Sequence, residues 1–384
     1  MTHNVAVVGC GSMGVGGPYD STFPFTYNHA AAVLKNPDAR LVALVDTDSV
    51  KLEAAAKKLR GGGYQTNFTL HQTLESATSL YTHAQRIDVV CCAAGPEANA
   101  EVITKAQDLG IRGVYCDKPM TLSLPEADRL AALETSSGLK VQVNYLRNFD
   151  PCHRAVIEYI RNGGIGNLLF VRILYKGGVL GVAPHALALL QLLFEKALMV
   201  SGIRSPLING RAPDDLNVDG AIRYYYAPEQ REVNVSLTAT GRGEIDNDTY
   251  LFEFEFTGTK ARVSILESGW RIRYEPMERS RIFGALGEMM PYDSACVPLA
   301  LKADAPREFM IDGLKQLLNA VDHDTPTSAG AALARDAEEV AHALALSAIQ
   351  EGRTMHLPLT DRSHVFKHAR AGTDLLAQEA GIKK

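Results

Sequence analysis

The feature that most constrains this chain is a short apolar strand that runs directly into a glycine-rich turn. Residues 4–8 read NVAVV, and Gly9, Gly11 and Gly14 follow in the spacing G-x-G-x-x-G. A strand before such a turn is typical of a dinucleotide-binding βαβ unit, in which the glycines permit a tight turn and close approach to a pyrophosphate. A glycine-rich turn without any ligand is the alternative interpretation.

The helix that normally follows such a turn is delayed. A helical pattern begins only near Tyr27, and residues 15–28 contain two prolines and further glycines. The acidic residue expected about 20 residues after the turn, at the end of the second strand, is here Asp46, 32 residues after the last glycine of the turn. One insertion of about a dozen residues explains both delays. Tyr19 and Asp20 lie in it and are candidate substrate contacts, although Asp20 as the cap of a turn is an alternative.

Apolar runs alternate with helical patterns through residues 1–146, which we expect to form a dinucleotide-binding domain. Continuous apolar strands between helices predict a parallel sheet that is covered on both faces. The expected strands are 4–8, 40–45, 87–92, 113–116 and 140–145, and the expected helices are 27–36, one after Asp48, 97–109 and one that begins at Ser123 with a capping box to Glu126.

The pattern changes in residues 147–384, the expected second domain. After a helix capped by Asp150, several segments alternate apolar and polar residues, as antiparallel strands with one packed face do. Phe252, Phe254 and Phe256 share one face of such a strand, and glutamates occupy the other. The last two expected helices, about 307–320 and 329–351, are expected to pack back on the rest of the chain.

Composition excludes several classes of protein. The net charge is −5 over 384 residues and no block of Lys or Arg stands out, so neither nucleic acid nor an anionic membrane is an expected partner. The six cysteines form no C-x-x-C pair, which argues against a metal site and a disulfide framework. Because a strand begins within a few residues of the N-terminus, no signal peptide is expected, and we expect a cytoplasmic location.

Several motifs together resemble the glucose–fructose oxidoreductase / inositol dehydrogenase (Gfo/Idh/MocA) family. The segment VYCDKPM, residues 114–120, ends a strand with acidic-Lys-Pro about 105 residues after the glycine motif, with Asp117 in place of the family's usual Glu. His29 stands where the family has a His early in the first helix, and residues 93–110 resemble the segment after its fourth strand. Residues 143–175 carry the family's Asn-Tyr-x-Arg-x-Phe-x-Pro and Gly-x-Ile-Gly signatures.

This resemblance implies a Rossmann domain followed by an α/β domain with an open-faced, largely antiparallel sheet. It implies hydride transfer between NAD(P) and a carbinol carbon, most often of a sugar, cyclitol or nucleotide-sugar. The implied cofactor-binding residues are Gly9, Gly11, Ser12, Met13, Gly14, Asp46, Ala94, Asp117, Lys118 and Pro119. The charge of Asp46 would repel a 2′-phosphate, which favours NAD over NADP, while Lys51 is a weak signal in the other direction.

The implied catalytic residues are Lys118, which can orient the substrate hydroxyl and stabilise an alkoxide, and His185, which can move its proton. A surface lysine after a strand and a core histidine are the respective alternatives. His153, in contrast, is expected to lie on the surface of a helix. Implied substrate contacts are Tyr145, Arg147 and Lys176, for which packing between domains (Tyr145) and a solvated strand end (Lys176) are the alternatives.

The catalytic segment departs from the family pattern Asp-x-Gly-x-His-x-x-Asp. Aligned on His185, this chain has Gly181 and Ala188 where the two aspartates are expected. The primary hypothesis is therefore an NAD-dependent sugar or cyclitol oxidoreductase without bound metal, assembled as a homodimer or homotetramer through the polar sheet face. A non-catalytic protein that senses NAD(P) or a sugar is one alternative, and a reductase of an imine or unsaturated substrate is another.

Overall fold

The computed structural model describes nine segments of the chain, residues 2–16, 26–62, 67–80, 86–207, 215–240, 252–269, 271–279, 289–291 and 308–366. The chain divides into two compact units, which are described separately. The first comprises residues 1–164, 187–194 and 296–339, and the second comprises 165–186, 195–295 and 340–384.

The first unit contains a parallel sheet with the strand order β3-β2-β1-β4-β5-β6. Strands β2 and β3 are added on one side of β1, and β4, β5 and β6 on the other, so the topological switch point lies at β1. Its strands are β1 (His3–Val8), β2 (Ala39–Val45), β3 (Thr69–His71), β4 (Val89–Cys92), β5 (Gly113–Cys116) and β6 (Lys140–Val143). The strands β1, β4 and β5 are completely buried along their lengths, as expected for a sheet that is covered on both faces. The predicted Rossmann architecture is confirmed.

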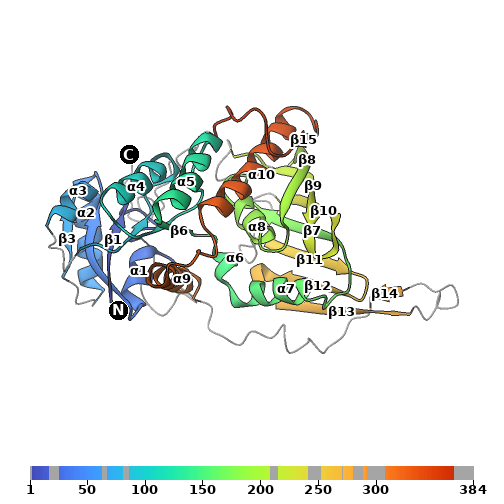
Figure 1. The fold of residues 1–384 in the computed structure, drawn as a ribbon, viewed down its shortest axis with the longest axis horizontal. Helices are drawn as coiled ribbons and strands as arrows, with labels where there is room; N and C mark the ends of the chain where they lie inside the picture. Colours follow the sequence, from blue (N-terminus) through green and yellow to red (C-terminus); the bar gives the residue numbers. More distant parts are fainter. Residues whose placement is uncertain are drawn as a thin grey trace. The chain divides into compact units, whose positions relative to one another are not determined.

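Helices cover both faces of this sheet, with α4 and α5 on one side and α1 and α9 on the other (Figure 1). The helices of the unit are α1 (His29–Lys35), α2 (Ser49–Gly61), α3 (Leu74–Ser79), α4 (Pro96–Asp108), α5 (Leu124–Ser137), α6 (Leu146–Phe149), α7 (Pro151–Arg161) and α9 (Phe309–His323). Gly113 lets α9 approach β5 closely, because a Cβ there would lie 2.9 Å from Val321 and 3.2 Å from Leu317.

Two local predictions for this unit are wrong. The Ser123 hydroxyl donates to the Glu126 carboxylate at 3.0 Å instead of capping a backbone amide, so the expected capping box does not form. His153, which the helical pattern places on a helix surface, is fully buried on α7. It pairs there with Asp150, whose carboxylate also accepts from the Cys152 amide and caps the helix.

The second unit contains a mixed sheet in the order β14-β13-β12-β11-β7-β10-β9-β8-β15. Its strands are β7 (Leu168–Lys176), β8 (Lys196–Arg204), β9 (Val218–Tyr226), β10 (Arg231–Thr240), β11 (Phe252–Gly258), β12 (Ala261–Leu266), β13 (Arg271–Arg279), β14 (Met289–Pro291) and β15 (Met355–His356). Every described pair is antiparallel except β7 with β10, which confirms a largely antiparallel sheet.

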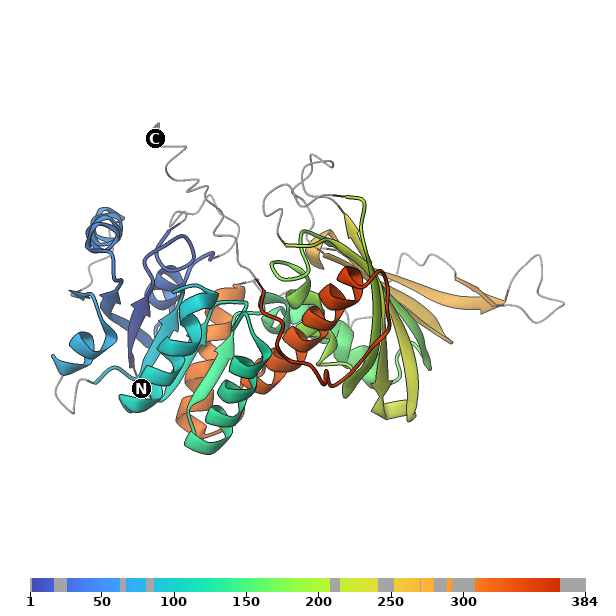
Figure 2. The ribbon, with the colours of Figure 1, turned by 90° about the horizontal axis from the view of Figure 1, so that it is seen from above.

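One face of this sheet is apolar and is covered by helix. Phe252, Phe254 and Phe256 are buried and follow one another along β11 in stacked contact. The last part of α10 (Ala331–Ile349) runs along this unit's sheet (Figure 2), where the absence of a side chain at Gly202 and Gly220 leaves room for Leu344. The expected division of β11 into an apolar and a polar face is confirmed.

Candidate active site

The glycine turn after β1 divides into two packed glycines and one that faces open space. Gly9 has φ +89°, and a Cβ there would lie 2.3 Å from the Ala93 carbonyl oxygen. A Cβ on Gly14 would lie 1.7 Å from the Gly9 carbonyl oxygen. A Cβ on Gly11, in contrast, would meet no heavy atom within 4 Å. The first and third glycines therefore shape the turn, while the second keeps the space before it clear, as a pyrophosphate requires.

Helix α1 is hydrogen-bonded to the glycine turn, although more than ten residues separate the two in sequence. The His29 amide donates to the Met13 carbonyl at 2.9 Å, and the Ala30 amide donates to the Gly14 carbonyl at 2.9 Å. Asn28 fastens the junction, because its side chain donates to the Gly16 carbonyl at 2.6 Å and accepts from the Ala31 amide at 2.9 Å. Backbone and side-chain hydrogen bonds thus join the start of α1 directly to the glycine turn, although an insertion separates the two in sequence. Tyr19 and Asp20, the candidate contacts within it, lie outside the described residues.

Asp46, directly after β2, binds the glycine turn from the side. Its Oδ2 accepts from the Cys10 amide at 2.7 Å, and its Oδ1 accepts from the Asp48 amide at 2.9 Å. The side chain is only half-buried, so its remaining lone pairs can accept from ribose hydroxyls. The open space at Gly11 and this carboxylate together fit a dinucleotide cofactor.

The Asp117-Lys118-Pro119 turn begins where β5 ends, and the Lys118–Pro119 peptide bond is cis. Asn99, one turn into α4, donates from its single side-chain nitrogen to the carbonyls of both Asp117 and Pro119 at 3.1 Å. The backbone on each side of Lys118 is therefore tied to the same buried amide. Lys118 itself is half-buried, which does not match the alternative of a solvated surface lysine.

A buried carboxyl holds the far end of the same turn. Glu338 accepts from the Met120 amide at 2.6 Å and the Thr121 amide at 3.2 Å, and the Thr121 hydroxyl donates to its other oxygen at 2.9 Å. Burial raises the pKa of Glu338 to about 7, and these three hydrogen bonds only partly oppose that rise.

Asp117 is also linked to a chain of buried polar groups. The Tyr115 hydroxyl donates to Asn144 Oδ1 at 2.8 Å, and the Asn144 side chain donates to Asp117 Oδ1 at 3.3 Å. The His29 ring packs edge-on to Tyr115 with 4.8 Å between centroids. Burial lowers the pKa of His29 to about 4, against a smaller opposing effect of Asp117, so the imidazole is neutral at physiological pH.

Tyr145 and Arg147 lie at the start of α6, between β6 and α7. Tyr145 is fully buried and Arg147 is 6% exposed. Burial, followed by the charge of Glu338, raises the pKa of the Tyr145 hydroxyl well above its ordinary value. Their role as substrate contacts stays a prediction.

In the second unit, Lys176 ends β7 and His185 lies near the start of α8 (Ala183–Leu190). Lys176 is 2% exposed, so the alternative of a solvated strand end is wrong. Gly177 has φ +119° and turns the chain, and a Cβ there would lie 2.7 Å from Val182. His185 is 7% exposed and packs edge-on to Phe252 with 5.8 Å between ring centroids.

A carboxylate from another part of the chain lies at the turn before α8. Asp215 Oδ1 accepts from the Leu180 amide and its Oδ2 accepts from the Gly181 amide, each at 2.8 Å. A Cβ on Gly178 would lie 1.9 Å from the carboxyl carbon of Asp215. The glycines of this turn therefore make room for the Asp215 side chain.

Sequence reasoning missed four of the polar residues that shape these two sites, namely Asn99, Asn144, Glu338 and Asp215. For Asn99 a signal existed, because the segment after β4 usually carries a His or Asn in the resembling family. Glu338 is a charged residue within the apolar stripe of a helix, which is also a recognisable signal. Nothing in the local sequence around Asp215 points to the turn that it binds.

Other kinds of site are absent from the parts of the chain that the structure describes. No cluster of three or more His, Cys, Asp or Glu residues there could hold a metal ion. Among the same residues, no helix is both long enough and apolar enough to cross a membrane. The described cysteines are buried and none of them forms a disulfide bond, namely Cys10, Cys91, Cys92, Cys116 and Cys152.

Comparison with known families finds a match for residues 3–145 of the chain. Residues 3–145 match the family model GFO_IDH_MocA, described as "Oxidoreductase family, NAD-binding Rossmann fold". The prediction of an NAD-binding Rossmann domain is thereby confirmed.

Two curated relatives carry the same likeness. The inositol 2-dehydrogenase of Rhizobium meliloti (strain 1021) is 30% identical over 145 residues, which are 38% of this chain and 40% of that protein. The scyllo-inositol 2-dehydrogenase (NAD(+)) of Bacillus subtilis (strain 168) is 28% identical over 180 residues, which are 46% of this chain and 45% of that protein. Each match spans less than half of the relative's own length.

The likeness among solved structures extends over nearly the whole chain. Levoglucosan dehydrogenase, in a complex with NADH, has a TM-score of 0.70 at 16% identity, and the match covers 94% of this chain and all of that one. At this identity the match shows the fold, and it confirms the two-part α/β architecture.

Proposed function

We propose, from the match of residues 3–145 to the GFO_IDH_MocA family model, that this protein is an NAD-dependent dehydrogenase of that oxidoreductase family. Its substrate class is a sugar, cyclitol or nucleotide-sugar, oxidised or reduced at a CH–OH carbon. The relatives named above as inositol 2-dehydrogenases support this class of substrate.

The observation that carries the proposal is the gathering of the cofactor residues at one edge of the parallel sheet. Gly9 follows β1, Asp46 follows β2, Ala94 follows β4 and Asp117 follows β5. These are the carboxyl ends of adjacent parallel strands around the point where the strand order reverses, which is where open α/β sheets bind nucleotides. The open space at Gly11 lies at the same edge.

The chemistry needs a cation for the substrate oxygen and a base for its proton. NAD supplies the acceptor or donor of the hydride when it is bound. Lys118 orients the hydroxyl and stabilises the negative charge that develops on the oxygen as the C–H bond breaks. His185 receives the hydroxyl proton in the oxidation and returns it in the reduction.

Asp46 favours NAD over NADP. Its carboxylate accepts from two backbone amides, and this hydrogen bonding keeps it beside the glycine turn. A ribose diol can donate to this group, whereas a 2′-phosphate would place a second negative charge against it.

Turnover tests the proposal directly. We expect the purified protein to bind NADH and to change absorbance at 340 nm with at least one member of a panel of sugars, cyclitols and nucleotide-sugars. Binding of NADH without turnover of any substrate in either direction would favour a sensor of NAD(P) or sugar, and turnover of an imine or unsaturated compound alone would favour the third hypothesis. Failure to bind any dinucleotide would contradict the proposal at its base.

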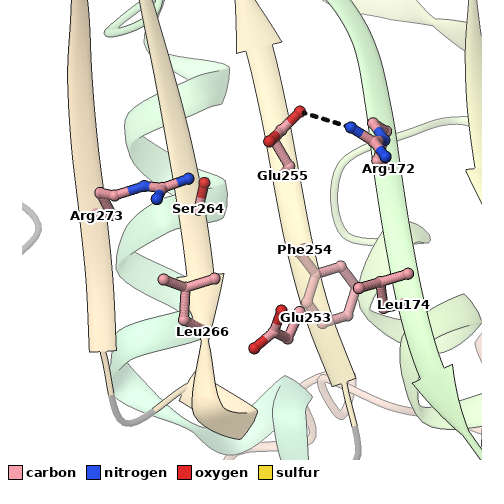
Figure 3. A pocket seen from close by; sticks show the side chains of 8 residues that line it. All are labelled: Arg172, Leu174, Glu253, Phe254, Glu255, Ser264, Leu266 and Arg273. Carbon is pink, nitrogen blue, oxygen red and sulfur yellow. Dashed lines mark ion pairs between the residues drawn. The ribbon is translucent and has the colours of Figure 1, made fainter. Parts of the chain in front are cut away.

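We also propose that the polar face of the second unit's sheet joins copies of the chain into a dimer or tetramer. Arg172, Glu253, Glu255, Ser264 and Arg273 line a shallow pocket on this face, with side chains of both charges side by side (Figure 3). Charges of both signs on one surface permit self-complementary pairing about a two-fold axis. Light scattering on the eluting protein measures the mass, and a monomer that persists at high concentration would overturn this part of the proposal.

A further inference from the structure

We propose that Asp215 supplies His185 with the carboxylate that is missing at Gly181 and Ala188, so that the site is completed from the start of β9. This inference rests on the proposed dehydrogenase function, in which His185 carries the substrate proton. It removes the observation that favours a non-catalytic sensor, namely the lack of an acidic partner near the histidine.

The position of the carboxylate is the first argument. If Gly181 had a Cβ, that atom would lie 2.8 Å from Asp215 Oδ2, so the Asp215 carboxylate occupies the place where the side chain of an aspartate at position 181 would begin. Two hydrogen bonds of 2.8 Å, from the Leu180 and Gly181 amides, hold it there. The residue that departs from the family pattern is thus the residue against which a distant carboxylate is bound.

The spacing to His185 is the second argument. The chain from Gly178 turns into α8 through hydrogen bonds from the Ala183 amide to the Gly178 carbonyl and from the His185 amide to the Val182 carbonyl, each at 3.1 Å. Gly181 lies in the turn before α8 and precedes His185 by four residues, the separation between the first aspartate and the histidine in the family pattern. The Asp215 carboxylate beside Gly181 therefore lies at the point of the turn where that pattern has its acidic residue.

The attachment of Asp215 to the sheet is the third argument. The Val179 amide donates to the Leu216 carbonyl at 2.8 Å, which joins the turn to the residue after Asp215. The Tyr175 hydroxyl donates to the Val218 carbonyl and accepts from the Val218 amide, both at 2.9 Å. The end of β7 and the start of β9 are thus fastened together, and a side chain at 215 is held in one place.

The step that this geometry supports balances as a two-electron oxidation. Bound NAD⁺ would accept the hydride from the C–H bond of the substrate, and His185 would accept the proton from its O–H bond, so that a ketone, NADH and an imidazolium account for both electrons and the proton. Asp215 takes no proton, and its negative charge favours the protonated imidazole. Among the described residues, Tyr175 near the end of β7 and Asp219 on β9 are ionisable groups close to Asp215 or to each other, and Lys176 ends the same strand β7.

The first experiment compares Asp215→Asn with Asp219→Asn in the full-length protein. Asp219 is a matched control, because it also accepts from a backbone amide of the same sheet, that of Ala239 at 2.8 Å. We expect Asp215→Asn to lower kcat about 100-fold, the size typical of a weakened acid–base group, and to leave the Kd for NADH unchanged. The control is expected to stay within about twofold of wild type.

The second measurement does not depend on turnover. The His185 ring is followed by NMR as a function of pH, with its signal assigned by the loss of one resonance in His185→Gln. We expect Asp215→Asn to lower the pKa of His185 by about one unit, because an anion close to an imidazole favours its charged form. We expect the acidic limb of the kcat–pH profile for the oxidation to move in the same direction, because His185 must be deprotonated to accept the hydroxyl proton.

A transplanted carboxylate gives the sharpest test. Asp215→Gly leaves the space beside Gly181 empty. Adding Gly181→Asp to this variant should raise kcat at least tenfold above that of Asp215→Gly alone and return the pKa of His185 toward the wild-type value. An Asp215→Asn variant that loses thermal stability while its kcat and its His185 titration stay at wild-type values would overturn the proposal. If the wild-type protein turns over no substrate but the titration shifts as expected, the proposed function fails while the coupling between Asp215 and His185 stands.

Discussion

The turn that carries Lys118 and the turn that precedes His185 are both held in place by hydrogen bonds to a carboxyl group, but the two carboxyl groups differ in burial. Each presents a functional side chain after a parallel-paired strand, and each is held by a carboxyl from far along the chain. At the first turn Glu338 accepts from Met120 and Thr121 and is completely buried. At the second turn Asp215 accepts from Leu180 and Gly181 and is only half-buried.

The difference shows that two turns can each be held by a distant carboxyl even though only one of them keeps the motif. The Lys118 turn keeps the family's acidic-Lys-Pro sequence and is held by a neutral amide as well, that of Asn99. The His185 turn lacks the motif's two aspartates, with Gly181 and Ala188 in their places, and has further glycines at 177 and 178. Gly178 and Gly181 leave space, and the side chain of Asp215, which precedes β9, fills it.

The largest expected effect is the loss of kcat when Lys118, the proposed catalytic residue of the first turn, is replaced. Lys118→Met removes the cation near the substrate oxygen, and we expect kcat to fall about 10²–10³-fold, the usual consequence of losing one group that stabilises an oxyanion. NADH binding, measured by fluorescence, should change little. Lys105→Met is the control, because Lys105 is an exposed helix residue paired with Glu75 and Glu101. Equal activity of Lys118→Met and wild type would contradict the assigned role.

The buried carboxyl of the first turn predicts a pH dependence of stability. Because the pKa of Glu338 rises from 4.5 to about 7 on folding, the folded state binds the proton more tightly than the unfolded state. The resulting stabilisation is complete below pH 4.5 and is lost as pH rises through about 7.

Glu338→Gln removes this titration and keeps the size of the side chain. We expect the free energy of unfolding of wild type, relative to that of Glu338→Gln, to decrease by about 3 kcal/mol between pH 4.5 and pH 8. Urea denaturation at both values measures it, and groups that titrate equally in the two proteins cancel. A difference that is constant with pH would show that the charge on Glu338 costs nothing in this site.

Asn99 tests whether the Lys118 turn needs its amide clamp. Asn99→Ala removes the amide donor from the carbonyls of Asp117 and Pro119. The Asp117 carbonyl keeps the Cys116 thiol, a weak donor at 3.2 Å. We expect a loss of about 2 kcal/mol in unfolding free energy, since each unsatisfied buried acceptor costs about 1–3 kcal/mol. Asn162→Ala at the end of α7, where the cap uses the backbone amide, is the control. An unchanged denaturation midpoint for Asn99→Ala would argue that the turn is held by Glu338 alone.

The smallest expected effect concerns Asp46 at the carboxyl end of β2. This prediction does not depend on the role of His185. Asp46→Asn removes the charge that opposes a 2′-phosphate, and we expect the ratio of the Kd for NADP to the Kd for NAD to fall about tenfold, or about 1.4 kcal/mol. Isothermal calorimetry with both cofactors measures this ratio. An unchanged ratio would place the discrimination elsewhere.

The elements of the first unit were predictable because their signals are local. The apolar runs of β1, β2, β4, β5 and β6 and the late Asp46 follow from periodicity and spacing. The strands β8 and β9 were not predicted, since residues such as the glycines at 202 and 220 interrupt their alternation. Those glycines are explained only by the packing of Leu344 against the sheet.

The polar contacts at the two turns were less predictable than the strands. Asp215 and Gly181 are 34 residues apart, and Glu338 and Thr121 are 217 apart. The residues next to a side chain in the sequence do not indicate which distant residue will bind it. The burial of His153, which the helical pattern suggested to be exposed, has the same origin.

The sequence by itself determined the Rossmann unit, the glycine turn, Asp46 and the acidic-Lys-Pro turn, because each depends on short-range backbone preferences and on the alternation of apolar residues. Only the tertiary structure decided how α1 is spliced across the insertion, which groups hold Lys118, and which carboxylate lies against Gly181. These depend on free space and hydrogen-bond partners that exist only after distant segments have packed, and a glycine in the sequence does not say what will fill the space it leaves.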